Sequence, residues 1–379
     1  MTKRHFVLFS ALEVTYWGFH ASFIGYAAAY MLSRGVSNTA VSLLLAGYLL
    51  CAFVGSVFFG SLCDRFQTNK RVFIPGMLAA YAMMFAIYFC ADKIAVLAVC
   101  YPLLGFFFQP QGINADAWVL SAYDHDQKMF GKIRSLPSFF YAIICAAMGK
   151  MISIFGYPVM LVSASVCMAM VIASAALLPD ARAVAETKKM KKEDFVRLLS
   201  SGQYRRLVVL LFLIGLAAAP INNLKIVLFE HVSGGVTHVG VDAFVSAMIQ
   251  VPFIAAAGAL GAIALRKRYM AMAFLPLTMI LIVRAATSPA MIFAGSFCYN
   301  AAYGVILVTM REVTERYVDK DLRNLGHNLS DAVFNSFSGV ISLMCAGAII
   351  DGFGVSTMIT ISALIAAIPA VMSMKKLED

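Results

Sequence analysis

The stretch GSLCDRFQTNKR, from Gly60 to Arg71, joins two long apolar runs. A bilayer interior cannot hold charged side chains at this density, because each one costs several kcal/mol there unless it is paired or faces water. The stretch therefore predicts a tight loop at a membrane surface. Gly60 has no side chain and would let a second helix approach its backbone. Asp64 offers a carboxylate that the positive N-terminus of a neighbouring helix would attract.

The composition indicates an integral membrane protein with little soluble mass. Of the 379 residues, 61% are hydrophobic and 13% are charged, whereas soluble domains carry about 25% charged residues. The net charge of +10 does not indicate a nucleic-acid partner, because the basic residues lie in short clusters between apolar runs. The eight cysteines are scattered through those runs without metal-binding spacing, so we expect small buried side chains, no metal and no cofactor.

Twelve apolar runs each predict one membrane-spanning helix of about 20 residues. They cover approximately 6–32, 39–62, 72–90, 94–120, 133–155, 158–178, 207–231, 239–265, 269–286, 289–310, 325–350 and 355–374. The expected organisation is a six-helix bundle over 1–179, a cytoplasmic linker over 180–206 and a second six-helix bundle over 207–379. The linker holds apolar side chains at helical spacing (Phe195, Leu198 and Leu199) and predicts either a helix on the inner membrane surface that ties the halves together or a disordered basic tether.

The distribution of positive charge predicts the orientation of the chain. With the N-terminus inside, 25 of the 30 Lys and Arg residues fall in inner segments, among them Arg65, Lys70 and Arg71. Cytoplasmic loops of membrane proteins carry this excess of basic residues. We therefore expect a multi-pass protein of the plasma (inner) membrane with both termini in the cytoplasm.

The loop after the second span resembles the signature of the major facilitator superfamily, G-x-L-x-D-R-x-G-R-R/K between helices 2 and 3. Gln67 stands where the second glycine is usual, and the basic pair comes about one residue late. The resemblance implies an all-α fold of two six-helix bundles with a substrate site between them near the midplane, which opens to each side in turn. The residues that match are Gly60, Leu62, Asp64, Arg65, Phe66, Lys70 and Arg71. The resemblance also implies a gating role for Gly60, Asp64, Arg65, Lys70 and Arg71.

Two shorter stretches resemble the oligosaccharide and nucleoside proton symporters of that superfamily. The sequence Gly131-Lys132-Ile133-Arg134 matches a G-K/R-x-R entry to helix 5, and Gln250-Val251-Pro252-Phe253 matches an E-x-P-F segment of helix 8. Gln250 replaces the usual glutamate. If that carboxylate takes part in coupling in the relatives, the role must lie elsewhere in this chain.

Ionisable residues within the first-half spans are candidates for proton coupling. Glu13 and His20 are seven residues apart and share a helix face. A buried carboxylate can take up and release a proton near neutral pH, which makes Glu13 a coupling candidate. His20 is a substrate-binding candidate. The structural alternatives are an inner-end salt bridge for Glu13 and a hydrogen-bonded core histidine for His20.

The fourth span carries three amides and one acid. Gln109, Gln111 and Asn114 are predicted to bind substrate, because an amide donates and accepts hydrogen bonds at once and suits hydroxyls or heterocycle edges. Asp116 lies near the inner end. It is a second proton-coupling candidate, with an ion pair to a basic residue of the adjoining loop as the structural alternative.

The second half carries a similar set of polar residues. Lys225 lies in an apolar run and must be paired, deprotonated or face an aqueous cavity; we favour the cavity. Asp331 lies on one stripe with Asn328 and Asn335, which indicates either a proton relay or inner-gate hydrogen bonding. The further substrate-binding candidates of this half are Asn222, Asn223, Gln250 and Asn300.

Together these features predict a secondary active transporter and not an enzyme, since no nucleophile motif or nucleotide loop is present in the sequence. The favoured function is proton-coupled symport of a small polar solute, nucleoside- or sugar-like, with sodium coupling left open. The alternatives are a proton-coupled multidrug efflux antiporter and a receptor or scaffold that does not transport. The expected partners are the solute, the coupling ion and membrane lipid, and the expected oligomeric state is a monomer.

Overall fold

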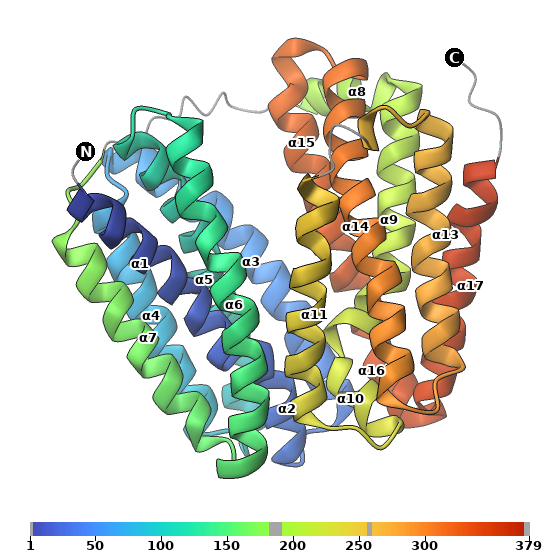
Figure 1. Ribbon diagram of the computed structural model, residues 1–379, viewed down its shortest axis with the longest axis horizontal. Coiled ribbons are helices and arrows are strands. Elements are labelled where there is room, and N and C mark those ends of the chain that lie inside the picture. Colours follow the sequence, from blue (N-terminus) through green and yellow to red (C-terminus); the bar gives the residue numbers. More distant parts are fainter. Residues whose placement is uncertain (1–2, 182–191, 256–259, 375–379) are drawn as a thin grey trace. The chain divides into compact units, whose positions relative to one another are not determined.

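A computed structural model describes residues 3–181, 192–255 and 260–374, all of them in helices or in the connections between helices (Figure 1). The chain divides into two compact units. Unit 1 comprises Met1–Lys188 together with Val239–Phe244, and unit 2 comprises Lys189–His238 together with Val245–Asp379. The boundary between Lys188 and Lys189 falls within the linker inferred from the sequence. Residues 182–191 of that linker, which include several of its basic residues, lie outside the described residues.

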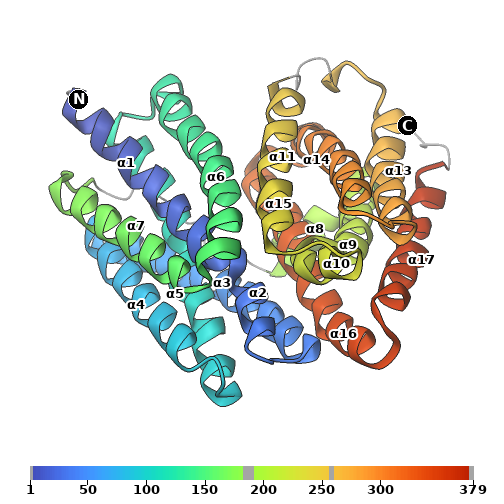
Figure 2. The ribbon, with the colours of Figure 1, turned by 60° about the horizontal axis from the view of Figure 1, so that its bottom comes forward.

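Unit 1 is a bundle of long helices (Figures 1 and 2). Its first span is interrupted by a π-helical turn, η1, and short connections join the spans that follow. Its elements are α1 (Lys3–Phe19), η1 (His20–Ile24), α2 (Gly25–Ser33), α3 (Asn38–Phe66), α4 (Lys70–Phe89), α5 (Ile94–Ala122), α6 (Gln127–Phe155) and α7 (Pro158–Leu177).

Small residues set the close packing of α3 against α5. Gly55 of α3 faces the backbone at Phe106, and Gly105 of α5 faces the backbone at Tyr48. A methyl group at either glycine would collide with that backbone, so the two helices approach closely only because both positions lack a side chain. Gly60 differs, since an added methyl group would meet nothing within 4 Å. The close helix contact that we expected at Gly60 is therefore not present among the described residues.

Unit 2 is also a bundle of long helices, together with the short helix α8 (Figure 2). The seventh predicted span is broken at Leu224 into two helices, and the eleventh contains a second π-helical turn, η3. The elements are α8 (Lys192–Ser200), α9 (Gly202–Asn223), α10 (Lys225–His231), α11 (Val236–Ala255), α13 (Leu265–Arg284), α14 (Pro289–Tyr317), η2 (Lys320–Leu322), α15 (Arg323–Ala332), η3 (Val333–Phe337), α16 (Ser338–Phe353) and α17 (Val355–Met374).

Corresponding turns in the two units have the same construction. Gly156 follows α6 with φ 76°, and Gly354 follows α16 with φ 84°. Positive φ favours glycine, and each of these glycines directly follows a phenylalanine and precedes the last helix of its unit. This shared turn is a local trace of the internal repeat that the topology predicts.

Each of the twelve predicted spans contains a helix within the described residues. Nine helices there are long and apolar enough to cross a membrane. Several helices extend further than the apolar runs, and an ion pair stabilises the charged extension of α14. Arg268 of α13, only 2% exposed, makes a two-pronged contact with Glu312 of α14 at 2.6 and 2.8 Å. As a result α14 continues to Tyr317, although its apolar run ends near Met310.

The described part of the linker forms a packed helix. Leu198 of α8 is 1% exposed and belongs to the apolar core of unit 2. Arg197 forms ion pairs with Asp319 at 2.6 Å and with Asp321 at 3.0 Å. These two carboxylates raise the pKa of Arg197. The helix is therefore fixed to unit 2 by one apolar and one ionic contact.

Candidate functional site

A chain of polar side chains runs through unit 2 and is centred on Asn300 of α14. Gln250 Nε2 of α11 donates to Asn300 Oδ1 at 2.7 Å. Asn300 Nδ2 donates to Ser246 Oγ at 2.9 Å and to the Ser296 carbonyl at 2.7 Å. Asn300 is 3% exposed, whereas Gln250 and Ser246 are half-buried. The amides of Gln250 and Asn300, predicted separately from the sequence, thus lie in direct contact.

Lys225 extends this chain from a break between two helices. Its Nζ donates to Ser296 Oγ at 2.5 Å, one turn before Asn300 on α14. Pro220 in the last turn of α9 has no N–H to donate, and α9 ends three residues later at Asn223. Asn223 Nδ2 donates back to the Ala219 carbonyl at 2.9 Å, so this amide stabilises the end of α9. Asn222 beside it is half-buried.

This arrangement provides donors and acceptors of several kinds within one unit. Amides offer both functions, serine hydroxyls can rotate to serve either, and the Lys225 ammonium only donates. Such a set can exchange its internal hydrogen bonds for bonds to hydroxyls or to the edge of a heterocycle. We refer to Lys225, Ser246, Gln250, Ser296 and Asn300 as the amide network.

Unit 1 holds a second polar centre, built from Glu13 of α1, Asp116 of α5 and Arg134 of α6. Arg134 Nε lies 3.2 Å from Asp116 Oδ1, and both side chains are about one-third exposed. Glu13 is 1% exposed and interacts electrostatically with Asp116 and Arg134. Trp17, one turn further on, lies close to Glu13. However, neither Glu13 oxygen has a partner at hydrogen-bond geometry among the described residues.

We refer to Glu13, Asp116 and Arg134 as the acid centre. It places two carboxylates around one guanidinium. If both acids are ionised, the group carries one excess negative charge, and the Glu13 carboxylate has no hydrogen-bond donor within the described ranges. A buried charged group without such a donor is costly, and one proton removes that cost. The ion pair of Asp116 is the structural alternative that the sequence left open, and its basic partner is Arg134, at the start of the fifth span.

The amides of α5 separate onto different faces. Gln109 Oε1 accepts from Tyr48 Oη of α3 at 3.2 Å and is half-buried. Gln111 is fully buried, lies over Gly76 of α4 and accepts from Asn114 Nδ2 at 3.0 Å. Gln111 and Asn114 thus bond to each other inside unit 1, which matches a structural role, and the structure does not bring them together with Gln109.

His20 begins the π-helical turn of the first span. Its Nδ1 lies 3.4 Å from Tyr141 Oη of α6, and its ring packs among Trp17, Phe108 and Tyr141. π-Helical turns within α-helices often occur at functional sites. The side chain is half-buried and remains in reach of a ligand.

The loop that resembles the superfamily signature is held by the segment that follows α7. Gln67 ends α3 with φ 50° and ψ 40°, a left-handed conformation that favours glycine. The Asp180 carboxylate accepts from Thr68 Oγ1 and, at 3.1 Å, from the backbone N–H of Lys70 at the start of α4. Lys70 Nζ in turn donates to the Leu178 carbonyl at 2.8 Å.

Asp64, Arg65 and Arg71 of the same motif lie at the surface of unit 1. Arg65 and Arg71 are exposed and Asp64 is half-exposed. The guanidinium of Arg65 lies 5.9 Å from the Phe66 ring centroid.

A family comparison decides what kind of protein carries these two centres. The model of the MFS_1 like family matches residues 7–361, which is nearly the whole chain.

The chain belongs to the MFS_1 like family.

Solved structures give the same fold. The nucleoside transporter NupG superposes with a TM-score of 0.85 at 12% identity, covering 98% of this chain and 98% of that one. A bacterial homologue of the human lysosomal transporter Spinster, inward-facing and unoccupied, gives 0.74 at 9% identity, with coverage of 98% and 97%. An auto-inhibited POT family peptide transporter gives 0.74 at 9% identity, with coverage of 99% and 98%. A search of curated protein sequences finds no significant match.

The family membership confirms the predicted fold class, a membrane protein of two six-helix bundles with the major facilitator fold. The protein is a transporter of this type and not an enzyme. Among the described residues, no group of three or more His, Cys, Asp or Glu side chains could hold a metal ion.

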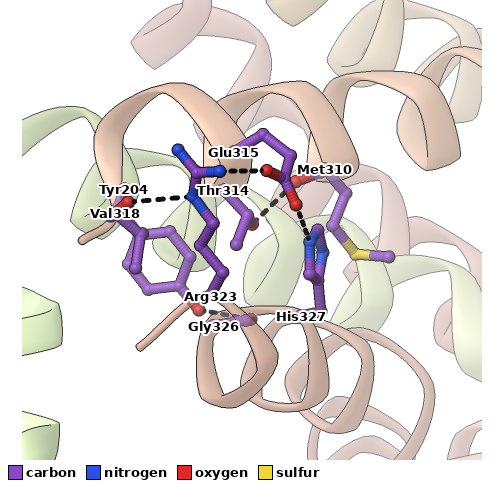
Figure 3. A network of polar contacts seen from close by, with 8 residues as sticks. All are labelled: Tyr204, Met310, Thr314, Glu315, Val318, Arg323, Gly326 and His327. Atoms are coloured by element: carbon purple, nitrogen blue, oxygen red, sulfur yellow. Dashed lines mark hydrogen bonds and ion pairs between the residues drawn. The ribbon is translucent and has the colours of Figure 1, made fainter. Parts of the chain in front are cut away.

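Near the C-terminal end of α14 in unit 2, the structure shows a polar network that the sequence analysis missed (Figure 3). Glu315 of α14 binds Arg323 at 2.6 Å and His327 at 3.1 Å, both from α15. Tyr204 of α9 donates to the Gly326 carbonyl at 2.7 Å. The sequence indicates only that charged side chains outside the apolar runs belong to loops. The helical spacing from Arg323 to His327 was the one available signal.

Asp331 lies one turn beyond this network and is exposed. Its Oδ1 accepts from Asn335 Nδ2 at 2.8 Å. The stripe inferred from the sequence therefore includes a hydrogen bond between its members. Asn328 lies on the same helix and is exposed.

Proposed function

We propose that this transporter moves a small polar, hydroxyl-bearing solute, nucleoside- or sugar-like, by alternating access. The observation that carries the proposal is the amide network of unit 2. Asn300 is nearly inaccessible, yet its amide oxygen and amide nitrogen each bond to a side chain of α11, Gln250 or Ser246, that can exchange the bond for one to a solute. A site built only for apolar packing would not need an asparagine that bonds to the side chains of both Gln250 and Ser246.

The fold comparison supports the solute class. NupG, with the same fold along its whole length, is described as a nucleoside transporter. Nucleosides combine hydroxyls with a heterocycle that has donors and acceptors on its edge. The Gln250 and Asn300 amides offer the complementary groups, and the Lys225 ammonium suits ring or carbonyl acceptors.

We further propose that transport is proton symport and that Glu13 carries the proton. Glu13 is nearly inaccessible and without a hydrogen-bond donor among the described residues. Asp116 and Arg134 set the local charge, so adding a proton changes the acid centre from a net charge of −1 to neutral. A site whose stability depends on one proton can bias one state of a transporter over another.

The remaining assignments follow from charge and position. We propose cytoplasmic termini in a plasma (inner) membrane, from the inside excess of basic residues. We assign inner gating to the motif loop of unit 1 and to the polar network of unit 2 drawn in Figure 3. The domain limits remain those inferred from the sequence, with α8 counted with the second bundle because Leu198 packs there.

Counterflow in proteoliposomes tests the proposal. Vesicles preloaded with unlabelled uridine should take up labelled uridine transiently, and Asn300→Ala should reduce this exchange at least about tenfold, since several hydrogen bonds of about 1 kcal/mol each are lost. Asn324→Ala, at an exposed position of α15, is the matched control and should retain exchange. Saturable binding without counterflow of any nucleoside or sugar would contradict transport and favour a receptor.

A further inference from the structure

Three aromatic rings of unit 1 form a cluster next to the acid centre. Trp17 and His20 come from the first span, and Tyr141 comes from α6. Ring centroids are separated by 5.8 Å for Trp17 and His20, 5.7 Å for His20 and Tyr141, and 6.2 Å for Trp17 and Tyr141. We call these three residues the aromatic triad.

The triad differs from the aromatic core around it in exposure. Tyr16 and Phe108 stack on each other at 4.5 Å and are fully buried. All three triad residues are only half-buried. Rings that serve packing alone are normally covered, so the part of the triad that remains accessible can contact a flat ligand.

The neighbouring charges narrow the class of ligand. The Arg134 guanidinium lies 5.2 Å from the Trp17 ring centroid and thus already occupies the position that an organic cation would take over that ring. A second cation cannot take the same position over that ring. An uncharged ligand that stacks on the rings and offers carbonyl acceptors to Arg134 is favoured instead, because a guanidinium donates in the plane of its fork.

We propose that the aromatic triad is the subsite for a planar nitrogen heterocycle, such as the base of a nucleoside. The ring of the solute stacks on the exposed aromatic faces, and Arg134 donates to its carbonyl oxygen. Stacking of bases on aromatic side chains tolerates different bases, because every base has a π-face. This inference rests on the proposed function and specifies the part of the solute that unit 1 recognises.

The placement of Trp17 connects this subsite with Glu13. The two residues are four positions apart on α1 and therefore lie on one face, and Trp17 interacts with Glu13. A heterocycle on the triad lies one side chain away from the proposed proton carrier. The solute and the proton would then act on the same helix of unit 1.

Tryptophan fluorescence tests the subsite without a transport assay. The chain has two tryptophans, and Trp118 is fully buried with its N–H donated to the Pro179 carbonyl at 3.0 Å. In Trp118→Phe, Trp17 is the single emitter. Uridine and uracil should quench this emission saturably, whereas ribose and choline should leave it unchanged. Saturable quenching by ribose or by choline, or none by uridine and uracil, would overturn the assignment.

Two further variants keep the test decisive. Trp17→Phe, in which only Trp118 emits, should show no saturable response to uridine. If Trp118→Phe does not fold, Tyr141→Leu in the otherwise natural chain should raise the half-saturating uridine concentration in counterflow about tenfold, with Tyr88→Leu as the control. An unchanged value would overturn the subsite. If the natural protein exchanges uridine in counterflow but none of these responses is seen, the subsite is contradicted and the proposed function stands. If the natural protein shows no counterflow at all, the proposed function is contradicted.

Discussion

The two units differ in how their buried polar groups are hydrogen-bonded. In unit 2, the Asn300 amide is engaged on both sides by Gln250, Ser246 and the Ser296 backbone. In unit 1, Glu13 is equally buried, but its carboxylate oxygens have no hydrogen-bond partner among the described residues. One centre is an amide that bonds to its neighbours, and the other contains a carboxyl group, that of Glu13, without a hydrogen-bond partner in the described part of the chain.

The difference indicates a division of roles. A satisfied neutral network can exchange its bonds for those of a solute at little net cost, because each internal bond lost is replaced by a bond to the ligand. An unsatisfied buried carboxylate responds most strongly to a proton, which no neutral amide can bind near neutral pH. We therefore assign solute recognition by hydrogen bonding to unit 2 and proton binding to unit 1.

Removing the ionisable carboxyl group of Glu13 in unit 1 should have the largest effect on transport. Glu13→Gln keeps the shape of the side chain but cannot exchange a proton. Accumulation of uridine driven by a proton gradient should fall to the passive level. Counterflow should stay within about twofold of the natural protein, or about 0.4 kcal/mol. Glu230→Gln, an exposed acid at the end of α10, is the control. Unchanged accumulation in Glu13→Gln would remove Glu13 as the coupling group.

Adding a charge to unit 2 should have a smaller effect. Gln250→Glu removes the N–H that donates to Asn300 Oδ1 and places a carboxylate beside that acceptor. The half-saturating uridine concentration should rise roughly five- to tenfold, the equivalent of about one hydrogen bond. Asn324→Asp on the exposed face of α15 is the matched amide-to-acid control. Equal affinity for natural protein and Gln250→Glu would speak against a solute site at the amide network.

The polar network drawn in Figure 3 offers a stability test in unit 2. Tyr204 is fully buried, and its hydroxyl donates to the Gly326 carbonyl and lies 3.0 Å from Ser330 Oγ. Tyr204→Phe should lower the free energy of unfolding by about 1–2 kcal/mol, because a buried carbonyl loses its donor. Tyr317→Phe is the control, and melting temperatures in detergent measure both. Equal melting temperatures for the two variants would show that this contact contributes nothing.

A substitution in the loop after α3 of unit 1 should raise the stability slightly, and this is the smallest of the expected effects. Gln67 holds a positive φ of 50°, which costs a non-glycine residue roughly 1 kcal/mol. Gln67→Gly relieves this strain but loses the exposed bond from Gln67 Nε2 to the Asp64 carbonyl, 2.7 Å long. A gain of about 0.5 kcal/mol is expected. A clear loss of thermal stability would show that the side-chain bond outweighs the strain.

The sequence predicted the parts of this account that depend on hydrophobicity and local order. The twelve apolar runs each contain a helix, and the departure from the signature at Gln67 coincides with a left-handed residue. Contacts between neighbouring helices could not be predicted in this way. Spacing along the chain indicates the depth and the helix face of a side chain, but not which residue of another helix it contacts. Gln250 and Asn300 are 50 positions apart, and only the fold brings them into contact.

The same limitation explains the incomplete predictions. Gln109 and Gln111 differ by two positions, so they point to different sides of α5, and only Gln111 lies over Gly76 of α4. The expected close contact at Gly60 is absent from the described residues, while Gly55, five positions earlier, makes one. Tyr204 and Glu315 lie at helix ends, outside the apolar runs, so hydrophobicity gives no sign of their contacts.

The most direct test of the division of roles measures proton movement together with solute movement. Proteoliposomes that enclose a pH-sensitive dye, without any imposed gradient, receive uridine from outside. The account predicts acidification of the lumen by the natural protein and none by Glu13→Gln, while labelled uridine still exchanges in both. Equal acidification by Glu13→Gln and the natural protein would contradict the assignment of the proton to unit 1.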